Sequence, residues 1–430
     1  MKAFSMNRRS FLKRSSLASL SATTLGALHV APSKAAAQAS QRVRVGVMGL
    51  GRGMAHVRAA LALPHVELAY VCDVDQQRTS QAIEAAAKSQ PQKPKGVADF
   101  RRMLDDKELD AVMIATCNHW HAPASILACS AGKHVYVEKP GSHNPQEGIW
   151  MVQSARKHNR VVQMGNQRRS WPAIQEAMAR LHAGVIGETT FARCWYDNAR
   201  GSIGKGNQIP TPPHLNYDLW QGPAPRRPFK DNLVHYNWHW HWHWGNGELG
   251  NNGIHALDLA RWGLQVDYPI KVTYNGGRYH HDDDQETPDT AIATYDFGSK
   301  GASWDGSSCH PRRSEANDFV RFYGTKGMLA INGTGYEVFD LDGKSLESHK
   351  GEGGDLGHMG NFFKCIRSGK RPNSEIEIGQ ISTLLCHLGN MAYRTSQTIH
   401  FDPKERRILN QPEAEALWER DYQEGWKPLI

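Results

Sequence analysis

An alternation of short apolar runs and helix-like segments constrains residues 43–164 of this 430-residue chain more than any other feature. Helix-like segments such as 54–63 and 76–89 separate runs rich in β-branched residues. The runs are 43–48, 66–72, 111–116, 134–137 and 161–164. Because parallel strands need a crossover between them, such alternation predicts an α/β fold with a doubly wound parallel sheet.

The segment between the first run and the first helix carries a functional signal. Gly49 and Gly51 stand where a dinucleotide-binding turn needs glycines, and the following helix N-terminus can stabilise a pyrophosphate. The third glycine position holds Met54, with Gly53 one place early. Asp73 ends the second run, where a carboxylate can accept hydrogen bonds from an adenosine ribose. Since that carboxylate repels a 2′-phosphate, the sequence predicts a Rossmann domain that binds NAD in preference to NADP.

The formal net charge of +8 is concentrated at the N-terminus. Six Lys and Arg residues lie within residues 1–39, which contain no acidic residue, and removing these six charges leaves +2. The remaining chain therefore gives no reason to expect a nucleic-acid partner. Residues 7–13, NRRSFLK, form a twin-arginine motif, and a weakly apolar stretch and small residues follow it. We expect residues 1–39 to be a signal peptide for the twin-arginine export machinery, and the protein to be periplasmic or otherwise exported.

The second half of the chain has a different pattern. A helix is expected at 172–183, a strand at 189–196, and then a long irregular region rich in Pro, Gly and Trp. Further strand candidates are 270–274, 290–297, 318–323 and 328–331, with a turn at 324–327 and a last clear helix at 378–395. Hairpins of this kind predict an α+β domain with a large, mostly antiparallel open sheet. The expected domains are residues 40–168 and 169–430.

Two other features limit the possibilities. No run outside the signal approaches the ~18 apolar residues of a membrane span, so we expect no span in the mature protein. The seven cysteines show neither CxxC nor Cys/His metal spacing, and their odd number argues against a disulfide framework.

A run of alternating Trp and His occupies residues 238–244. In an extended strand its four tryptophans would lie on one face and its three histidines on the other. The tryptophans could form a wall or a platform for a sugar ring, whereas three histidines on one face could bind zinc. We favour a wall that packs against the second sheet, with Trp238 near the substrate, and predict no metal.

A Gly/Asn-rich loop then leads into a helix-like segment. With Asn251 or Asn252 as N-cap, His255 falls in the first helical turn, where the helix dipole disfavours its protonated form. A neutral histidine there can accept a proton. A partly buried helix histidine with a hydrogen-bond partner fits the spacing equally well.

Several motifs, in order, resemble the Gfo/Idh/MocA oxidoreductases, the family of glucose-fructose oxidoreductase and inositol dehydrogenase. They are Gly49/Gly51, TCNHWHAP at 116–123, AGKHVYVEKP at 131–140, GNNGIHALD at 250–258, FYGTKG at 322–327 and CHLGNMAYR at 386–394. The resemblance implies a Rossmann domain followed by an open-faced α/β domain. The sheet of that second domain often forms a dimer interface, so a homo-oligomer is expected.

The resemblance also implies roles for particular residues. Lys139, of the Glu-Lys-Pro motif, would lie between the nicotinamide ribose and the substrate hydroxyl, and His255 would be the base of an Asp-x-x-x-His motif. The Asp of that motif is Asn251 here, which can hydrogen-bond an imidazole four residues on but cannot stabilise an imidazolium by charge. Either the proton relay is weaker, or Glu248 or Asp258 supplies the carboxylate.

Further site candidates follow from their positions after strands or in these motifs, and surface or packing roles are open for each. For the cofactor they are Arg52, Gly53, Asn118, His121 and Glu138. For the substrate they are Gln167, Arg168, Tyr196, Arg200, Trp238 and Asp258.

The sequence therefore predicts an exported NAD-dependent oxidoreductase acting on a hydroxyl of a sugar or polyol. Because free NAD is scarce outside the cytoplasm, we expect the cofactor to stay bound and to be recycled in place. One alternative is a redox-assisted glycosidase or lyase, in which transient oxidation acidifies a neighbouring C–H and allows elimination. Another is a non-catalytic sugar-binding protein, which Asn251 favours and Lys139 and His255 oppose.

Overall fold

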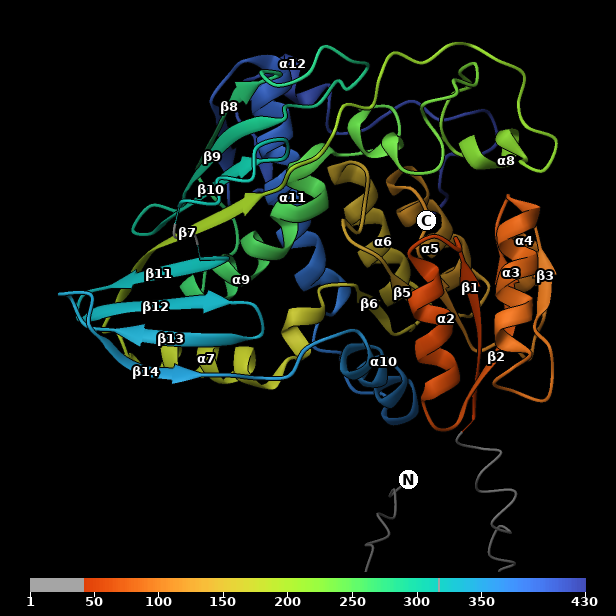
Figure 1. Cartoon of the computed structure of the whole chain (residues 1–430), viewed down its shortest axis with the longest axis horizontal. Helices are drawn as coiled ribbons and strands as arrows, with labels where there is room; N and C mark the ends of the chain where they lie inside the picture. Colours follow the sequence, from red (N-terminus) through yellow and green to blue (C-terminus); the bar gives the residue numbers. More distant parts are fainter. Residues whose placement is uncertain (1–41, 316–317) are drawn as a thin grey trace, which may run out of the picture. The chain divides into compact units, whose positions relative to one another are not determined.

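The structure, a computed structural model, describes residues 42–315 and 318–430. The expected signal peptide, residues 1–39, lies outside them. Within the described residues the chain forms two sheets with helices packed against them (Figure 1). No helix of this part of the chain is both long and apolar enough to cross a bilayer.

The first sheet has six parallel strands in the order β3-β2-β1-β4-β5-β6. The predicted doubly wound sheet is confirmed, and the five predicted strands agree with the structure to within two residues at each end. The sequence pattern misses β3, because this strand is short and largely exposed. The strands are β1 (Val43–Met48), β2 (Val66–Cys72), β3 (Lys95–Val97), β4 (Ala111–Ile114), β5 (His134–Val137) and β6 (Val162–Met164).

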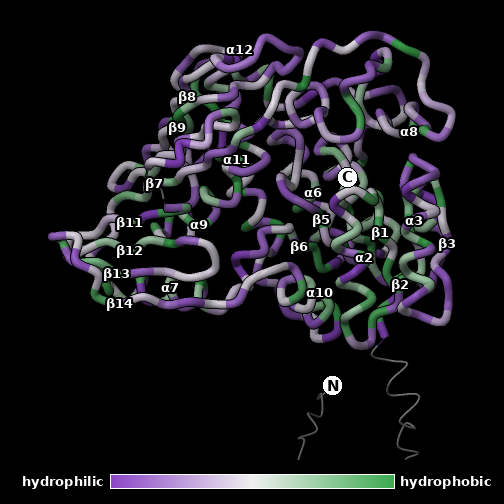
Figure 2. Tube along the Cα trace, in the orientation of Figure 1, coloured by the Kyte–Doolittle hydropathy of each residue, from purple (hydrophilic) through white to green (hydrophobic). Residues whose placement is uncertain are grey.

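Helices cover this sheet and complete its core. Those of the first part of the chain are α2 (Gly53–Ala62), α3 (Gln76–Ala86), α4 (Arg101–Leu104), α5 (Asn118–Ser130) and α6 (Pro145–Lys157). Hydrophobic stretches concentrate in the strands and in α2 (Figure 2). Far along the chain, α10 (Leu356–Ser368) adds Met359, Phe362 and Phe363 to the apolar cluster formed by α2 and β1. A late helix thus completes the core of the first sheet.

The second sheet has ten strands in the order β14-β13-β12-β11-β7-β10-β9-β8-β15-β16. Its neighbouring strands are antiparallel except for the parallel pair β7 and β10, so the mostly antiparallel prediction is confirmed. The pattern misses five of these ten strands, namely β10, β13, β14, β15 and β16. The sequence of β10, GASWDGS, contains no β-branched residue. The strands are β7 (Thr189–Asp197), β8 (Lys271–Gly277), β9 (Thr290–Asp296), β10 (Gly301–Ser307), β11 (Val320–Gly324), β12 (Gly327–Asn332), β13 (Gly335–Phe339), β14 (Ser345–His349), β15 (Ile399–Asp402) and β16 (Arg407–Ile408).

One face of the second sheet packs against α7 (Pro172–His182), α9 (Ile254–Leu264) and α11 (Ile376–Thr395). The strands alternate accordingly, and in β9 the exposed Ile292 and Thr294 alternate with buried neighbours. The other face is therefore open, as expected for an antiparallel sheet with one covered side. That this open face pairs with a second copy of the chain stays a prediction. A short helix, α12 (Pro412–Glu415), follows the last strands.

The Trp/His run is not extended, so the arrangement with tryptophans on one face and histidines on the other does not form. Residues Asn237–Trp240 form a 3₁₀ turn, and further turns follow. Their backbone hydrogen bonds are local: the Trp238 carbonyl accepts from the His241 N–H at 3.3 Å, and the His241 carbonyl accepts from the Trp244 N–H at 3.1 Å. Turns bury the rings of Trp238, Trp240 and Trp244. Trp238 and Trp244 pack in an apolar cluster with the Rossmann residue Cys117, not in the cluster of the second sheet. The row of three histidines needed for a zinc site does not form in this segment.

The Gly/Asn-rich segment is not the predicted loop. Residues Leu249–Gly253 form a π-helical turn that continues into α9, and neither Asn251 nor Asn252 caps the helix. His255 therefore does not lie in a first turn, and the helix-dipole argument fails. Close packing explains the glycines, because a Cβ at Gly253 would lie 2.9 Å from the Leu249 side chain and 3.2 Å from the Trp304 ring.

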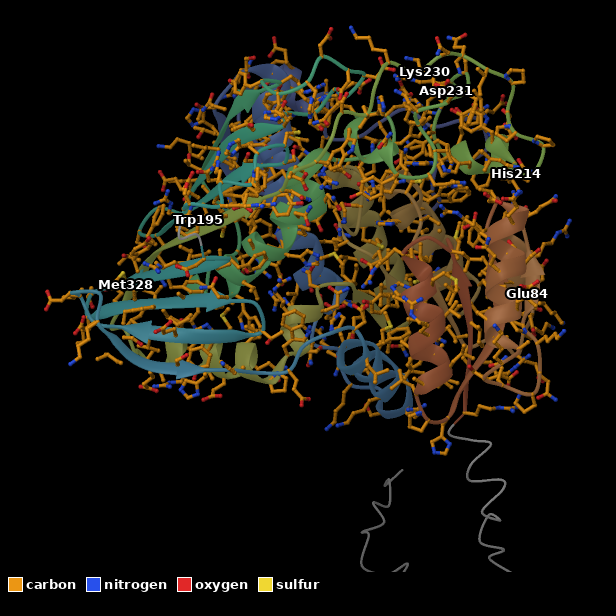
Figure 3. The ribbon with its side chains drawn as sticks, in the orientation of Figure 1. Glu84, Trp195, His214, Lys230, Asp231 and Met328 are labelled. Atoms are coloured by element: carbon orange, nitrogen blue, oxygen red, sulfur yellow. The ribbon has the colours of Figure 1, made fainter. Side chains whose placement is uncertain are left out.

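Residues 198–244, called the strap below, run from the end of β7 across the top of the first sheet (Figure 1). The strap is tied to the Rossmann backbone where β2 meets α3. There the His214 carbonyl accepts a hydrogen bond from the Gln76 N–H at 3.0 Å, and the Asn216 N–H donates to the Val74 carbonyl at 2.9 Å. Figure 3 labels His214 at this junction, beside the end of α3.

A short helix, α8 (Tyr217–Gln221), anchors the middle of the strap. Its Trp220 carbonyl accepts hydrogen bonds from the Trp120 indole and from the His119 ring nitrogen, both at 3.0 Å. The Trp220 ring packs with those of Tyr217 and Trp244 in an apolar cluster that includes Rossmann residues. The middle of the strap is therefore packed onto the Rossmann domain, while its residues Lys205 and Lys230 pair with Asp282 and Asp284 of the second domain.

Candidate active site

A cavity of about 680 Å³ lies at the carboxyl ends of the strands of the first sheet. This is where open α/β sheets bind their ligands. Rossmann loops line one side, and the strap and the start of α9 line the other. The volume is within the range that holds a cofactor or a small substrate.

The glycine turn after β1 forms one end of the cavity. Gly49 has a φ of +85°, and a Cβ there would lie 2.6 Å from the Ala115 carbonyl oxygen, so only glycine fits. A Cβ at Gly53 would lie 3.1 Å from a Val47 methyl, which means that Gly53 provides the close helix-to-strand packing of the third glycine. The displaced glycine is thus compatible with a dinucleotide turn.

Asp73 lies at the same end, where β2 stops. Its carboxylate accepts hydrogen bonds from the Leu50 N–H at 2.7 Å and the Asp75 N–H at 2.9 Å. These bonds tie Asp73 to the glycine turn. Its position fits a group that accepts a hydrogen bond from an adenosine ribose.

Arg52 and Glu138 form a charged pair beneath the centre of the cavity. The buried Glu138 carboxylate contacts the Arg52 guanidinium at 3.1 Å and the His56 ring at 3.0 Å. Burial opposes its ionisation, but the hydrogen bond from His56 and the charge of Arg52 hold the pKa of Glu138 well below its usual range. Arg52 also pairs with Asp355, which immediately precedes α10, at 2.6 Å. The sequence pattern did not reveal Asp355, because it lies some 300 residues from its partner.

Asn118 and His121, at the start of α5, both line the cavity. The two ring nitrogens of His121 lie 2.6 Å from the Pro140 carbonyl and 3.0 Å from the Thr116 carbonyl. A neutral imidazole can donate only one of these bonds. His121 therefore joins the loops that follow β4 and β5, while Asn118 lines the cavity from the first turn of α5.

Lys139 follows β5 and is held by the π-helical turn. Its ammonium group donates to the Asn251 backbone carbonyl at 2.7 Å and to the Asn251 side-chain oxygen at 2.9 Å. The wide π turn explains why Asn251 contacts Lys139 rather than His255, since its geometry differs from the i, i+4 pairing of an α-helix. Burial lowers the pKa of Lys139. The expected Asn251–His255 hydrogen bond is not formed.

His255 lines the cavity near Lys139. Burial lowers the pKa of His255 well below its ordinary value, and the charges of Lys139 and Arg168 add to this effect. The ring is therefore neutral at physiological pH and can accept a proton. Its neutrality, which the sequence attributed to a helix dipole, comes instead from burial and from two neighbouring cations.

Of the remaining substrate candidates, Gln167 and Trp238 line the cavity. Arg168 lies beside its wall, with its guanidinium stacked on Trp171, a cavity residue. Asp258 is placed elsewhere: it is 1% exposed and forms a bidentate pair with Arg169 at 2.8 and 2.9 Å. It does not reach the cavity and holds α9 in place.

Tyr196 and Arg200 lie behind the cavity wall and support Tyr236. The Arg200 guanidinium donates to the Tyr236 hydroxyl at 2.8 Å and to the Tyr196 hydroxyl at 3.1 Å, and it pairs with Glu248 at 3.1 Å. Of these four residues only Tyr236, which is half exposed, lines the cavity. Glu248 does not contact His255 and so does not replace the missing Asp.

Several cavity residues have no sequence signal that would have singled them out. The strap supplies Tyr236, His239 and His235, and the first turn of α3 supplies Arg78. They come from irregular segments or lack a motif, so their positions depend on how the strap folds.

The turn, the cavity and the Lys139–His255 pair define a dinucleotide-binding α/β protein with two potential proton-transfer groups. Two family models match the chain: an oxidoreductase NAD-binding Rossmann domain over residues 43–166, and an oxidoreductase C-terminal alpha/beta domain over residues 181–428. The chain belongs to the Gfo/Idh/MocA family of oxidoreductases.

Relatives extend the comparison. A glycosyl hydrolase family 109 protein of Parabacteroides distasonis is 27% identical over 306 residues, which cover 64% of each chain. An alpha-N-acetylgalactosaminidase of Shewanella oneidensis is 33% identical over 127 residues, which cover 28% of each chain. The chain thus spans less than two thirds of the length of either relative.

Solved structures show the same fold. An aldose-aldose oxidoreductase from Caulobacter crescentus superposes with a TM-score of 0.64 at 18% identity, covering 84% of this chain and all of that one. The WlbA dehydrogenase from Bordetella pertussis, in complex with NADH and UDP-GlcNAcA, gives a TM-score of 0.64 at 19% identity over 84% of this chain and 99% of that one. At these identities the likeness concerns the fold alone.

Proposed function

We propose that the protein is an NAD-dependent oxidoreductase that oxidises a hydroxyl of a sugar or polyol. The observation that carries this proposal is that Lys139 and His255 line the same cavity as the glycine turn and Asp73. When bound there, the nicotinamide would accept the hydride. The family of the chain supports the same conclusion.

The two reacting side chains divide the proton chemistry. The Lys139 ammonium group, held by two oxygens of Asn251, would stabilise negative charge developing on the substrate oxygen. The neutral His255 would remove the hydroxyl proton. Asn251 therefore acts as a positioning residue for Lys139, and the departure from the family Asp affects the charge near the lysine rather than the orientation of the histidine.

NAD is the preferred cofactor in this proposal, because the Asp73 carboxylate would repel a 2′-phosphate. Arg78 is the one observation that favours NADP instead. Its guanidinium lies 3.0 Å from the position that a Cβ on Gly51 would occupy, beside the glycine turn. An arginine there can accommodate a 2′-phosphate. Titration of the cofactor-free protein with NAD and NADP separates the two, and tighter NADP binding would contradict the assignment.

We also infer that the cofactor is retained and recycled within the protein. The strap packs onto the Rossmann domain and lines the cavity with Tyr236 and Trp238, so cofactor release would require the strap to move. Twin-arginine export of folded protein, which the sequence of residues 1–39 supports, would deliver such a loaded protein outside the cytoplasm. Residues 40–168 and 169–430 remain the proposed domains, with an oligomer formed through the second sheet.

A redox-assisted glycosidase is the second candidate, and the glycosyl hydrolase family 109 relatives favour it. The same Lys139 and His255 would serve a transient oxidation that is reversed after elimination. Hydrolysis of a glycoside without net change in the bound nicotinamide would identify this reaction, whereas lasting reduction would identify a dehydrogenase.

The decisive experiment uses the purified mature protein. Nicotinamide absorbance should co-purify, and a panel of sugars and glycosides should yield turnover. The variant His255→Ala should lose at least roughly 100-fold in kcat, the scale of general-base catalysis, while keeping its melting temperature and bound cofactor. Unchanged turnover would mean that the base is misassigned, and a protein with neither cofactor nor turnover would leave only the sugar-binding alternative.

A further inference from the structure

The cations at the reacting end of the cavity bear on the choice of substrate. Two cations lie at this end of the cavity: Lys139 lines it, and the Arg168 guanidinium stacks on Trp171, which also lines it. Among the described residues neither cation forms an ion pair with a carboxylate, since Lys139 is held by Asn251 and the Arg168 guanidinium contacts only aromatic rings. The buried carboxylates of Glu138 and Glu248 nevertheless act on Lys139 and oppose the lowering of its pKa, whereas burial alone shifts the pKa of Arg168, so Arg168 is the cation without a nearby carboxylate.

Arg168 is held in a fixed position by two aromatic rings. Its guanidinium carbon lies 4.0 Å from the centre of the Phe319 ring and 4.9 Å from that of Trp171. Its Nε is buried without a hydrogen-bond partner in the described part of the chain. Burial lowers the pKa of Arg168 to about 10, so the group stays protonated at neutral pH. A half-buried, unpaired cation is costly unless a ligand supplies the opposite charge.

The next residue shows what a paired arginine looks like in this fold. Arg169 is fully engaged by the two carboxylate oxygens of Asp258, with Ser382 as a further partner of the carboxylate. Arg168, one position earlier in the same turn, has no such partner among the described residues and stacks on Trp171, a residue of the cavity wall. Two adjacent arginines therefore serve different purposes, and only the second is explained by the fold.

We propose that the substrate is a sugar acid whose carboxylate binds Arg168 while its reacting hydroxyl lies between Lys139 and His255. The inference rests on the proposed function, because the hydroxyl site is the one assigned there. A guanidinium fixed between two rings offers a planar edge, which matches a carboxylate through two parallel hydrogen bonds. This arrangement would also neutralise one of the two cations beside His255.

Calorimetric titration of the cofactor-loaded protein tests the proposal without requiring turnover. The ligands are the matched pairs glucose and glucuronate, galactose and galacturonate, together with glucose 6-phosphate and galactose 6-phosphate. We expect at least one uronate to bind tenfold or more tightly than its neutral sugar. Arg168→Gln should lower the affinity for that uronate roughly 10- to 100-fold and leave the affinity for the neutral sugar within twofold.

Three further variants complete the design. Arg168→Lys keeps the positive charge but not the planar guanidinium with its parallel N–H donors, and it should recover only part of the affinity for the uronate. Arg168→Met keeps the aliphatic stem between the rings and serves if the Gln variant fails to fold. Arg102→Gln, at an exposed arginine of α4 outside the cavity, should change nothing.

Several outcomes would overturn the proposal. One is equal affinity for the uronates and their neutral sugars. Another is an equal loss of affinity for both in Arg168→Gln. A third is a higher affinity for the sugar phosphates than for the uronates. If uronates bind through Arg168 but no nicotinamide is bound and no turnover occurs, the proposed oxidoreductase fails while the carboxylate site stands. If neutral sugars are oxidised and uronates are not bound, the proposed oxidoreductase stands and the carboxylate site fails.

Discussion

Lys139 and His255, the two proposed reacting groups, owe their protonation states to burial and to neighbouring charges. Burial lowers the pKa of both, and the positive charge of Lys139 lowers that of His255 further. The cation and the neutral base can therefore coexist over a wide pH range. Asn251 binds the Lys139 ammonium group through two neutral oxygens, so it adds no negative charge that would raise the pKa of Lys139.

The pH dependence of kcat/KM follows from these shifts. His255 must be neutral to act as the base, and since its pKa is lowered, activity should persist below pH 6.5, its ordinary value. Lys139 must be protonated, and since its pKa is also lowered, activity should fall at a pH below 10.5. Rates from pH 4 to 11 would check both limbs. An acidic limb at or above pH 6.5 would contradict the assignment of His255.

The variant Asn251→Asp restores the family carboxylate and isolates its effect. The new charge would lie where the amide oxygen now lies, 2.9 Å from the Lys139 nitrogen, and should raise the pKa of Lys139. The alkaline limb of kcat/KM should move up by roughly one to three pH units. Asn251→Ala, which keeps only the backbone acceptor, is the control and should not move it upward. No upward shift in the Asp variant would mean that the alkaline limb does not report Lys139.

At the scale of elements, the π-helical turn before α9 and the strap together shape the cavity. The π turn brings Asn251 to Lys139, and α11 packs against it so closely that a Cβ at Gly389 would lie 2.5 Å from the Leu249 side chain. The strap is tied to the start of α3 through Asp75, whose carboxylate accepts a hydrogen bond from the Gln77 N–H at 2.8 Å and contacts His235 at 2.9 Å.

Weakening this tie should speed the release of the cofactor. In Asp75→Asn the side chain can still cap α3, because asparagine is an equally good N-cap, but its charge-assisted contact with His235 is lost. We expect the dissociation rate of the bound nicotinamide cofactor to rise roughly 2- to 10-fold, with little change in melting temperature. Stopped-flow measurement against excess labelled cofactor would show this.

The matched control is Asp340→Asn, in the exposed turn between β13 and β14, which should leave the rate unchanged. An unaltered rate in the Asp75 variant would indicate that the backbone bonds of the strap suffice to hold it closed.

At the scale of the whole molecule, segments from late in the chain bind the two sheets into one unit. Helix α10 completes the core of the first sheet, and α11 contacts both α6 and β8. Near the C-terminus, Arg420 pairs with the buried Glu147 at 2.7 Å, and Trp426 packs edge-on against Trp120. These contacts suggest that the described domains unfold together.

Buried neutral histidines should make this unit sensitive to acid. Burial lowers the pKa of His119, His121, His358 and His387, all of which are nearly inaccessible. Above pH 6.5 these histidines are unprotonated in both the folded and the unfolded state, so their protonation does not reduce the free energy of unfolding. As the pH falls below 6.5 only the unfolded state gains protons, and each histidine costs about 1.4 kcal/mol per pH unit until its own folded-state pKa is reached.

Melting temperatures between pH 8 and pH 4.5 would check this expectation. The decline should start near pH 6.5, and His387→Gln should make it shallower by about the contribution of one histidine. A melting temperature that stays constant down to pH 5 would show that these rings do not resist protonation.

Much of the fold and part of the site could be predicted from the sequence, because both depend on local patterns. The apolar runs and glycine turn predicted the Rossmann sheet, and hairpin patterns predicted the second sheet. Lys139, Asp73 and His255 follow directly from motifs at strand or helix ends. The sequence left the conformation of the Trp/His run open, because alternation cannot distinguish a paired strand from turns that bury the same rings.

The sequence by itself determined the two sheets, the glycine turn and the residues that can carry the chemistry, since each depends on neighbours within a few positions. The tertiary structure alone decided that Asn251 holds Lys139 and that Asp258 pairs with Arg169. It also decided that the strap lines the cavity and that Arg168 has no carboxylate partner among the described residues. These outcomes depend on contacts between residues far apart in the chain. Each buried charged group and aromatic ring needs a partner, and that partner comes from a distant part of the chain that no local pattern specifies.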